Sequence, residues 1–447
     1  SYMVKREICR KIRDLGIIGN IRFVDHHLCH INSSLHTSGF KEALALSFDG
    51  QGDGYCSKIY LMKDNGRQKK LIYKNVFFKS LAYYYGYTTK ILGFKPMEHE
   101  GKIMALAASG NPDKAFEIFN SRLFFDNIRG KFIKKGYYNL PEIEYIKEKL
   151  ADFSREDIAA GVQKHLETNA ISYIRYFLKK NPADKIALSG GIFANVLLNQ
   201  KISELPEIKE IHIHPNMGDG GLALGAAIEI VTRFPCYSNK RIDDVFFGPS
   251  LTGDMEVLKS KYGLNEIEKD DILFHVADLL AQNKIIGLVE GRMEYGPRAL
   301  CHRSILCNPF NHSINDILNK KLQRSEFMPF APVVLSDDVT HYFEDVDKKM
   351  FAMKFMTITC NTKEIFQKQA PATNHIDNTA RPQIVFKDTG RIYKILEYFK
   401  KITGCSVLVN TSFNMHEEPI VNSIEDAIIA FKKSGIDFLM IENRLFY

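Results

Sequence analysis

Three histidines and two carboxylates form the first group of residues that could do chemistry. His26, His27 and His30 fall within five residues of the sequence. If this segment is a helix, His26 and His30 are one turn apart, and their imidazoles could hold one divalent metal ion. Asp49 and Asp219 each follow a candidate strand beside glycine and could complete the site. This donor set suits iron(II), manganese or zinc, with iron or manganese favoured where positions stay open. The alternative is a helix that carries histidines without a metal.

Three glycine-rich loops follow candidate strands and could hold phosphate groups. They are DGQGDG (49–54), SGG (189–191) and GDGG (218–221), with the candidate residues Gly50, Gly52, Gly190, Gly191, Gly218 and Gly220. A residue without Cβ allows a phosphate to approach backbone N–H groups closely. A single loop of this kind is ordinarily only a turn, whereas three resemble the loops of the actin, sugar-kinase and Hsp70 superfamily. Asn195 and Asn199 follow the second loop, where their amides could bind a ribose, a base or a substrate hydroxyl, or could simply be exposed.

A second group of candidate residues is basic and lies in the other half of the chain. The segment GRMEYGPRALCHRSIL carries Arg292, Arg298 and Arg303, with apolar residues between them. Arginine forks suit phosphate or carbamate oxygens, which accept bidentate hydrogen bonds, and the apolar spacing argues against a solvated basic face. Further candidates for the same anion pocket are Lys321, Arg324, Ser412 and Asn414.

These residues need elements that position them, and the sequence predicts an α/β arrangement. Segments 43–48 and 57–62 predict a hairpin around the first glycine loop, and segments 185–188 and 211–213 each predict a strand that leads through glycine into a helix. Further helices are expected at 4–15 and 272–282. The periodicity fails around 235–249, which predicts two domains, 1–249 and 250–447.

Composition excludes several other classes of protein. The chain has 447 residues, of which 45% are hydrophobic and 25% charged, and its formal net charge is +7. These values are typical of globular proteins, and the mild positive charge favours anionic small molecules more than nucleic acid. The eight cysteines form no CxxC pair, which argues against a disulfide framework and favours a cytoplasmic location. No apolar run is long enough to predict a membrane span, and a homodimer is left open.

The motifs in combination resemble the NodU/CmcH-type O-carbamoyltransferases, the family that includes the tobramycin carbamoyltransferase. The matching strings appear in the family's order; they include DHHLCH, SFDGQGDG, HEGKIMALA, SGGIFANVLLN, GDGGLALGAA, GRMEYGPRAL, FMPFAPVV, NHIDNTARPQ and NTSFNMHEEPIV. The resemblance implies an actin-like (ASKHA, Kae-type) carbamoyl-transfer domain followed by a YrdC-like domain that makes carbamoyl-AMP from carbamoyl phosphate and ATP with magnesium. The acceptor would be a hydroxyl of a small molecule, natural product or saccharide.

The resemblance also implies roles for individual residues. Iron(II) would be bound by His26, His30, Asp49 and Asp219, and the anion pocket would use Arg298, Arg303, Lys321, Arg324, Ser412 and Asn414. His27 is a candidate base or orienting group, and Asp49 is a candidate catalytic residue as well as a ligand. The chain departs from the family at Cys301 and His302, in ALCHRS for ALGNRS, and at Glu417, in HEEP for HGEP. It also has Ala105, in MALA for MGLA.

Two other functions fit parts of the sequence. One is a threonylcarbamoyl-type protein that modifies tRNA, against which stands the second, arginine-rich domain. The other is a degenerate nucleotide-binding scaffold without turnover. The family normally has a further strand-rich segment before the DHH motif, with a phosphate-contacting turn. We therefore expect the 447-residue chain to be part or remnant of a longer polypeptide, to bind nucleotide weakly in its first domain, and to transfer carbamoyl slowly or not at all.

Overall fold

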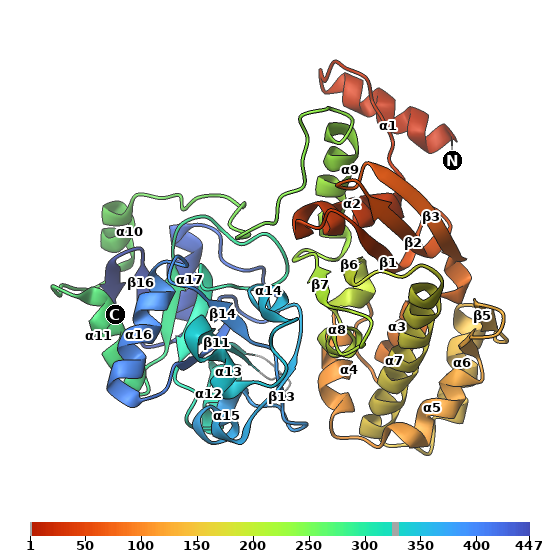
Figure 1. The fold of residues 1–447 in the computed structure, drawn as a ribbon. Coiled ribbons are helices and arrows are strands. Elements are labelled where there is room, and N and C mark those ends of the chain that lie inside the picture. Colours follow the sequence, from red (N-terminus) through yellow and green to blue (C-terminus); the bar gives the residue numbers. More distant parts are fainter. Residues whose placement is uncertain (1, 324–329) are drawn as a thin grey trace.

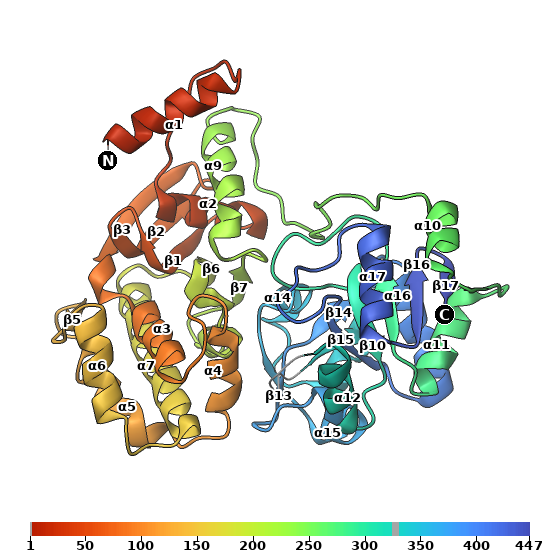
Figure 2. The same cartoon turned by 180° about the vertical axis from the view of Figure 1, so that it is seen from behind.

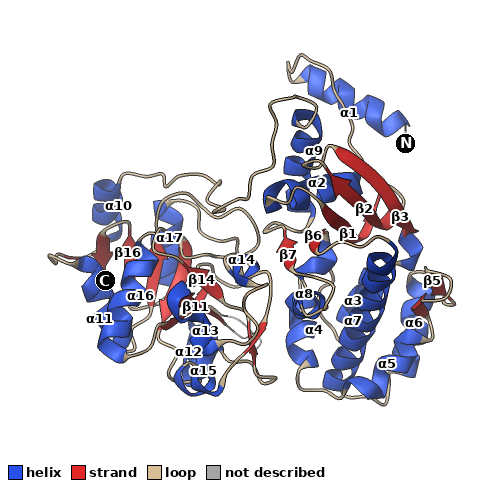
Figure 3. Cartoon of the chain, viewed as in Figure 1, coloured by secondary structure: helices blue, strands red, loops and turns tan. Residues whose placement is uncertain are grey.

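The computed structural model describes residues 2–323 and 330–447, which form two lobes joined by an extended segment (Figure 1). Figure 2 shows the same two lobes from behind, with helix α1 (Tyr2–Asp14) projecting from the N-terminal lobe. Both lobes combine helices with a sheet (Figure 3), so the predicted mixed α/β fold is confirmed. The more specific actin-like and YrdC-like assignments, and the predicted boundary between residues 249 and 250, stay predictions.

The N-terminal lobe is built on a five-stranded sheet with the strand order β3-β2-β1-β6-β7. Its strands are β1 (Ala43–Gly52), β2 (Tyr55–Lys63), β3 (Gln68–Val76), β6 (Lys185–Ser189) and β7 (Glu210–Ile213). The predicted hairpin is confirmed as the antiparallel pair β1 and β2, while β6 and β7 run parallel to β1. Leu44 and Leu46 join one buried cluster and Ala43 and Ala45 another, because successive side chains of a strand point to opposite faces.

Helices cover both faces of this sheet. Helix α2 (His26–Ser38) packs on one face beside α9 (Leu222–Val231), and α7 (Arg155–Lys180) lies against the other. The remaining elements are η1 (Phe77–Lys79), α3 (Leu81–Ile91), α4 (Glu100–Ala107), α5 (Pro112–Asn120), β4 (Leu123–Asp126), β5 (Lys131–Lys134), α6 (Leu140–Lys149), η2 (Gly191–Ala194), α8 (Val196–Ser203) and η3 (Asp219–Gly221). Since η2 with α8 follows β6, and η3 with α9 follows β7, both predicted strand–glycine–helix units are present.

The C-terminal lobe contains an eight-stranded sheet with the order β14-β11-β15-β10-β9-β16-β17-β8. Its strands are β8 (Glu266–Ile267), β9 (Ile286–Val289), β10 (Arg303–Cys307), β11 (Ala331–Leu335), β14 (Gln383–Val385), β15 (Val407–Ser412), β16 (Phe438–Ile441) and β17 (Arg444–Phe446). A separate pair consists of β12 (Cys360–Asn361) and β13 (Thr379–Ala380). As in β1, the side chains of adjacent residues in β10 point to opposite faces, with Ile305 in one buried cluster and Leu306 in another. Both faces of this sheet are therefore covered.

Two sets of helices provide that cover. Helices α11 (Ile272–Ala281) and α16 (Arg391–Thr403) pack together on one face, and α10 (Met255–Tyr262), α12 (Ser313–Lys321) and α17 (Ile424–Ser434) join the cluster on the other. The shorter helices are η4 (Ser336–Asp338), α13 (Val339–Tyr342), α14 (Met350–Met353), α15 (Glu364–Gln369) and η5 (Pro371–Thr373). All eight cysteines are free thiols. Among the described residues, no helix combines the length and the apolar character that crossing a bilayer requires.

Candidate functional site

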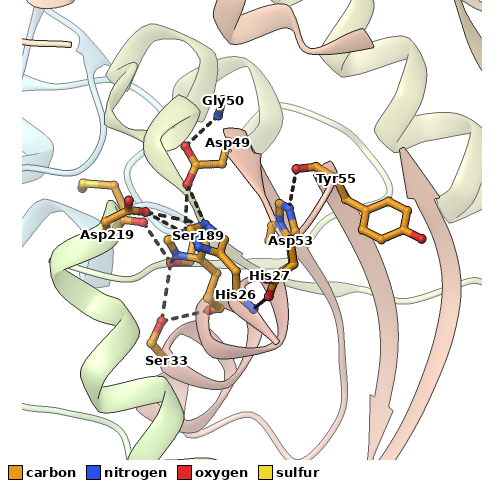
Figure 4. A network of polar contacts seen from close by, with 12 residues as sticks. His26, His27, Ser33, Asp49, Gly50, Asp53, Tyr55, Ser189 and Asp219 are labelled. Atoms are coloured by element: carbon orange, nitrogen blue, oxygen red, sulfur yellow. Dashed lines mark hydrogen bonds and ion pairs between the residues drawn. The ribbon is translucent and has the colours of Figure 1, made fainter. Parts of the chain in front are cut away.

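Four side chains from distant parts of the N-terminal lobe converge at one point (Figure 4). Nε2 of His30 lies 2.9 Å from Oδ2 of Asp49 and 3.5 Å from Oδ1 of Asp219. Nε2 of His26 lies 3.4 Å and 3.6 Å from the same two oxygens. Two ligands that each lie about 2.1 Å from one metal ion are about 3.0–3.4 Å apart. The residues therefore fit a single ion, as the sequence predicts, while the presence and identity of the metal stay predictions.

Helix α2 presents both histidines because its first turn is anchored. Asp25 precedes the helix, and its carboxylate accepts a hydrogen bond from the Leu28 N–H at 2.9 Å. The other oxygen of Asp25 pairs with Nζ of Lys58 in β2 at 2.6 Å. An N-cap of this kind satisfies a backbone donor that has no partner within the helix. The start of the helix is thus tied to the sheet that carries Asp49.

The cluster is electrostatically self-complementary. Burial alone would raise the pKa of Asp49, but the hydrogen bonds from His26 and His30 outweigh burial and hold that pKa well below its usual range. Burial would likewise lower the pKa of His30, whereas its contacts with Asp219 and Asp49 raise it. In this arrangement the two carboxylates favour a positive charge on His30. A divalent cation would supply the same kind of charge.

Ser189 orients one of the histidines, and our sequence reasoning did not single it out. Its hydroxyl donates to the carbonyl oxygen of Met217 at 3.0 Å and lies 3.2 Å from Nδ1 of His30. Because the single hydroxyl hydrogen is directed to Met217, the oxygen is left to accept a hydrogen bond from the Nδ1–H group. Nε2 then faces the carboxylates, which is how an outer hydrogen bond directs a ligating histidine. The available signal was the position of this serine at the end of a predicted strand.

His27 is placed differently from its two neighbours. Its ring is fully buried, with Nδ1 2.9 Å from Oγ of Ser47 and Nε2 3.0 Å from the carbonyl oxygen of Tyr55. Burial lowers the pKa of His27 to about 4. Since both ring nitrogens are engaged by the sheet, these contacts favour a role in positioning α2 over the predicted role as a base.

Several of the predicted glycines allow close packing around the cluster. A Cβ on Gly52 would lie 2.1 Å from the His26 ring, and one on Gly191 would lie 3.0 Å from Oδ1 of Asp49. Gly190 has φ +115°, and a Cβ there would lie 2.3 Å from the carbonyl oxygen of Phe48. A Cβ on Gly220 would lie 2.6 Å from the Asn216 amide, whereas the equivalent positions on Gly50 and Gly218 have no neighbour within 4 Å. Phosphate binding by these loops stays a prediction.

The two predicted asparagines are used in packing. Asn195 caps α8 by accepting a hydrogen bond from the Leu198 N–H at 2.9 Å, and it exchanges hydrogen bonds with Gln163. Asn199 is fully buried, and its Nδ2 donates at 2.7 Å to the carbonyl oxygens of Phe193 and of Thr357 in the other lobe. These contacts join α8 to its surroundings and do not support the predicted contacts with a ribose or a base.

In the second lobe, Arg303 and Glu294 organise the arginine-rich loop. The Arg303 guanidinium is buried and donates to the carbonyl oxygens of Glu290, Gly291, His302 and Asn422. Oε1 of Glu294 accepts from the N–H groups of Leu300, His302 and Arg303. The guanidinium of Arg303 is therefore engaged by the backbone rather than presented to a predicted phosphate.

Arg298 is the arginine that remains available to an anion, and Arg381 lies near it. Nε of each, like Nε of Arg303, is buried without a hydrogen-bond partner among the residues that the structure describes. Of these three arginines, Arg303 is the one whose terminal nitrogens donate to backbone carbonyl oxygens within the described part of the chain. Burial lowers the pKa of Arg298 to about 10, and burial together with the charge of Arg298 lowers the pKa of Arg381. Two adjacent cations with unsatisfied donors favour a bound anion. Arg381 was missed although it lies in the NHIDNTARPQ string, because no arginine cluster surrounds it in the sequence.

The other predicted pocket residues have local partners. Nζ of Lys321 donates to the carbonyl oxygen of Gly435, Oγ of Ser412 lies 2.6 Å from Oδ1 of Asn414, and Nδ2 of Asn414 donates to two carbonyl oxygens of its own turn. Arg324 lies outside the described residues. Cys301 and Glu417, where the resemblance leads us to expect glycine, have φ values of 74° and 60°. These are left-handed conformations that favour glycine.

Comparisons with known proteins agree with the two-part arrangement. The family model described as "Carbamoyltransferase N-terminus" matches residues 4–228, and "Carbamoyltransferase C-terminus" matches residues 277–447. The uncharacterized protein MJ1058 of Methanocaldococcus jannaschii is 34% identical over 100% of this chain and 76% of its own length. Nodulation protein NolNO of Sinorhizobium fredii is 33% identical over 95% of this chain and 64% of its own.

One of the relatives is named for an enzymatic activity. The 3'-hydroxymethylcephem-O-carbamoyltransferase of Amycolatopsis lactamdurans is 27% identical over 78% of this chain and 65% of its own. A solved structure of full-length HypF with bound phosphate and nucleotide is 18% identical, covers 40% of this chain and 22% of its own, and has a TM-score of 0.29. The family resemblance inferred from the motifs is thus confirmed by the family models and the sequence relatives. The chain belongs to the NodU/CmcH-type carbamoyltransferase family and is a transferase enzyme.

Proposed function

We propose that this chain carbamoylates a hydroxyl of a small molecule, natural product or saccharide, with carbamoyl phosphate and ATP as co-substrates and carbamoyl-AMP as the intermediate. The C-terminal lobe would form the intermediate and the N-terminal lobe would transfer its carbamoyl group. The observation that carries the proposal is the convergence of His26, His30, Asp49 and Asp219, a donor set that fits one metal ion, in a lobe distinct from the one with the arginine pair.

In the C-terminal lobe, carbamoyl phosphate, ATP and water would yield carbamoyl-AMP, pyrophosphate and phosphate. Every one of these reactants and products except water carries phosphate oxygens or a carbamoyl group. Nε of Arg298 and Nε of Arg381 are buried without a partner among the described residues, and a guanidinium fork that donates two parallel hydrogen bonds would match such oxygens. Arg303 and Glu294 would support this site by holding the loop that carries Arg298. We therefore propose the YrdC-like chemistry for the lobe with the arginine pair.

In the N-terminal lobe, the acceptor oxygen would attack the carbamoyl carbon, AMP would leave, and the hydroxyl proton would pass to a base. An alcohol is a poor nucleophile near neutral pH. A metal ion held by His26, His30, Asp49 and Asp219 would supply Lewis acidity, which polarises a carbonyl oxygen or acidifies a hydroxyl. The chain's own contribution is positional: Ser189 directs His30, and the anchored first turn of α2 keeps both imidazoles on one side. Iron(II) is the first candidate, followed by manganese and zinc.

The two-lobe division can be tested with variants of one residue from each site. We expect the anaerobically purified wild-type chain to bind about one metal ion, because the four ligands form a single site. His30→Ala should lose the metal and keep the carbamoyl-phosphate-dependent exchange of pyrophosphate into ATP. Arg298→Ala should keep the metal and lose the exchange. Full metal content in His30→Ala would contradict the ligand assignment, and loss of exchange in that variant would contradict the division between lobes.

A further inference from the structure

The arginine-rich loop of the C-terminal lobe reaches the metal-ligand loop of the N-terminal lobe through Tyr295. This tyrosine precedes Arg298 in the same loop. Its hydroxyl donates to the carbonyl oxygen of Gly220 at 3.3 Å and lies 3.4 Å from Nε2 of His214. Gly220 directly follows the candidate ligand Asp219. One hydroxyl group from the second lobe therefore contacts the turn that carries a ligand in the first.

The second contact of Tyr295 leads to the helix that carries the histidine ligands. His214 is fully buried, and its ring meets the Tyr295 ring edge to face, with the ring centroids 5.8 Å apart. Nδ1 of His214 lies 3.2 Å from Oγ1 of Thr37, which belongs to α2. Tyr295 is thus linked through Gly220 to the turn that carries Asp219. Through His214 it is linked to α2, the helix that carries the two histidine ligands.

The backbone around Tyr295 holds the side chain in this place. The Tyr295 N–H donates to the carbonyl oxygen of Val245 at 2.7 Å. The next residue, Gly296, has φ +126°, and a Cβ there would lie 3.1 Å from the carbonyl oxygen of Pro215. The two loops therefore approach each other along their main chains. Such an approach leaves Tyr295 little freedom to turn away from Gly220.

We propose that Tyr295 is a positioning residue that holds the Asp219 turn in its ligand-binding conformation. The inference rests on the metal centre in the proposed function and adds a dependence of that centre on the other lobe. Both contacts of the hydroxyl are at the long end of hydrogen bonding, so each is weak alone. Outer hydrogen-bond partners of metal ligands usually change affinity or activity by about 10- to 100-fold, and we expect about tenfold, the lower end.

The test replaces Tyr295 by phenylalanine, which keeps the ring and removes the hydroxyl. Tyr398→Phe is the matched control, because it removes a 2.7 Å solvent-exposed hydrogen bond from a partly buried tyrosine to Asp271, away from both sites. Co²⁺ is titrated anaerobically into each metal-free chain and followed by its visible absorption. We expect Tyr295→Phe to bind Co²⁺ about tenfold more weakly with an altered spectrum at saturation, and to retain the wild-type melting temperature and pyrophosphate exchange. Tyr398→Phe should match the wild-type chain in every measurement.

The outcomes separate the inference from the function on which it rests. Equal Co²⁺ affinity and equal spectra in Tyr295→Phe and wild type would overturn the role of Tyr295 and leave the metal centre intact. A wild-type chain that binds no Co²⁺, or a His30→Ala variant that binds it as well as wild type, would overturn the metal centre and this inference together. If Tyr295→Phe binds Co²⁺ more weakly and its metal-free chain also melts at a lower temperature than wild type, Tyr295 acts on general stability. That result would also overturn the inference.

Discussion

Gly52 faces the ring of His26 so closely that a methyl group on its Cα would lie 2.1 Å from Cδ2 of the imidazole. Gly50 lies two residues earlier in the same loop, yet a methyl group there would have no neighbour within 4 Å. The loop thus contains one glycine that the candidate ligand requires and one that it does not. This difference makes a matched pair of variants possible.

We expect Gly52→Ala to displace the His26 ring and to weaken metal binding by about tenfold or more, the size typical of disturbed ligand support. Gly50→Ala should bind metal as wild type does. Isothermal titration of metal-free chains with Co²⁺ measures both affinities. If Gly52→Ala binds with wild-type affinity, the imidazole of His26 is not held as a ligand in this position.

Removing one arginine of the pair Arg298 and Arg381 should raise stability and abolish anion binding. Replacing Arg381 with methionine removes a buried charge close to Arg298, so the free energy of unfolding of the ligand-free chain should rise by about 1 kcal/mol. The same variant should lose the rise in melting temperature that pyrophosphate causes in wild type. Arg129→Met changes an exposed arginine and serves as the control. A pyrophosphate response that survives in Arg381→Met would argue against this pair as the anion site.

Glu417 is expected to reduce stability through its backbone. Its φ is 60°, a left-handed conformation in which a side chain is disfavoured. Glu417→Gly should raise the free energy of unfolding by about 0.5–1 kcal/mol. Glu417→Ala removes the carboxylate but keeps Cβ, and it should therefore leave stability close to wild type. Chemical denaturation distinguishes the two variants, and equal gains in both would assign the effect to charge instead of conformation.

The pH dependence of stability should reflect His165. This residue is buried in α7 with Nε2 2.6 Å from the carbonyl oxygen of Leu123, and burial lowers its pKa to about 4. An unfolded histidine titrates near 6.5, so between about pH 6.5 and 4 only the unfolded chain takes up this proton. The free energy of unfolding should fall by about 1.4 kcal/mol per pH unit from this group as the pH is lowered through that window.

Urea denaturation at pH 7 and pH 5 measures this effect. His165→Gln, which cannot take up the proton, should show a smaller loss of stability between the two pH values than wild type. His341→Gln changes an exposed histidine and should behave as wild type does. An unchanged pH dependence in His165→Gln would show that burial does not suppress the protonation of His165.

Short-range patterns in the sequence were enough to predict the elements around the site. The hairpin of β1 and β2 and the two strand–glycine–helix units were predicted from β-like runs and glycine placement, and the i, i+4 spacing of His26 and His30 showed that a helix would place them on one side. These features depend on residues close together in the chain, whose steric and hydrogen-bonding preferences act locally. The same local motifs, in their order, also indicated the family that the comparisons confirm.

The use of individual polar side chains was decided only by the tertiary structure. Arg298 and Arg303 look equivalent in the sequence, and Nε of each lacks a partner among the described residues. The terminal nitrogens of Arg303, however, donate to four backbone carbonyls, whereas Arg298 lies near a second buried arginine, Arg381. Asn199 likewise bonds to a carbonyl of the other lobe. A buried donor must find an acceptor wherever the fold brings one, and that acceptor can come from any part of the chain. Sequence therefore determined which groups could do chemistry here, and long-range packing decided which of them are free to do it.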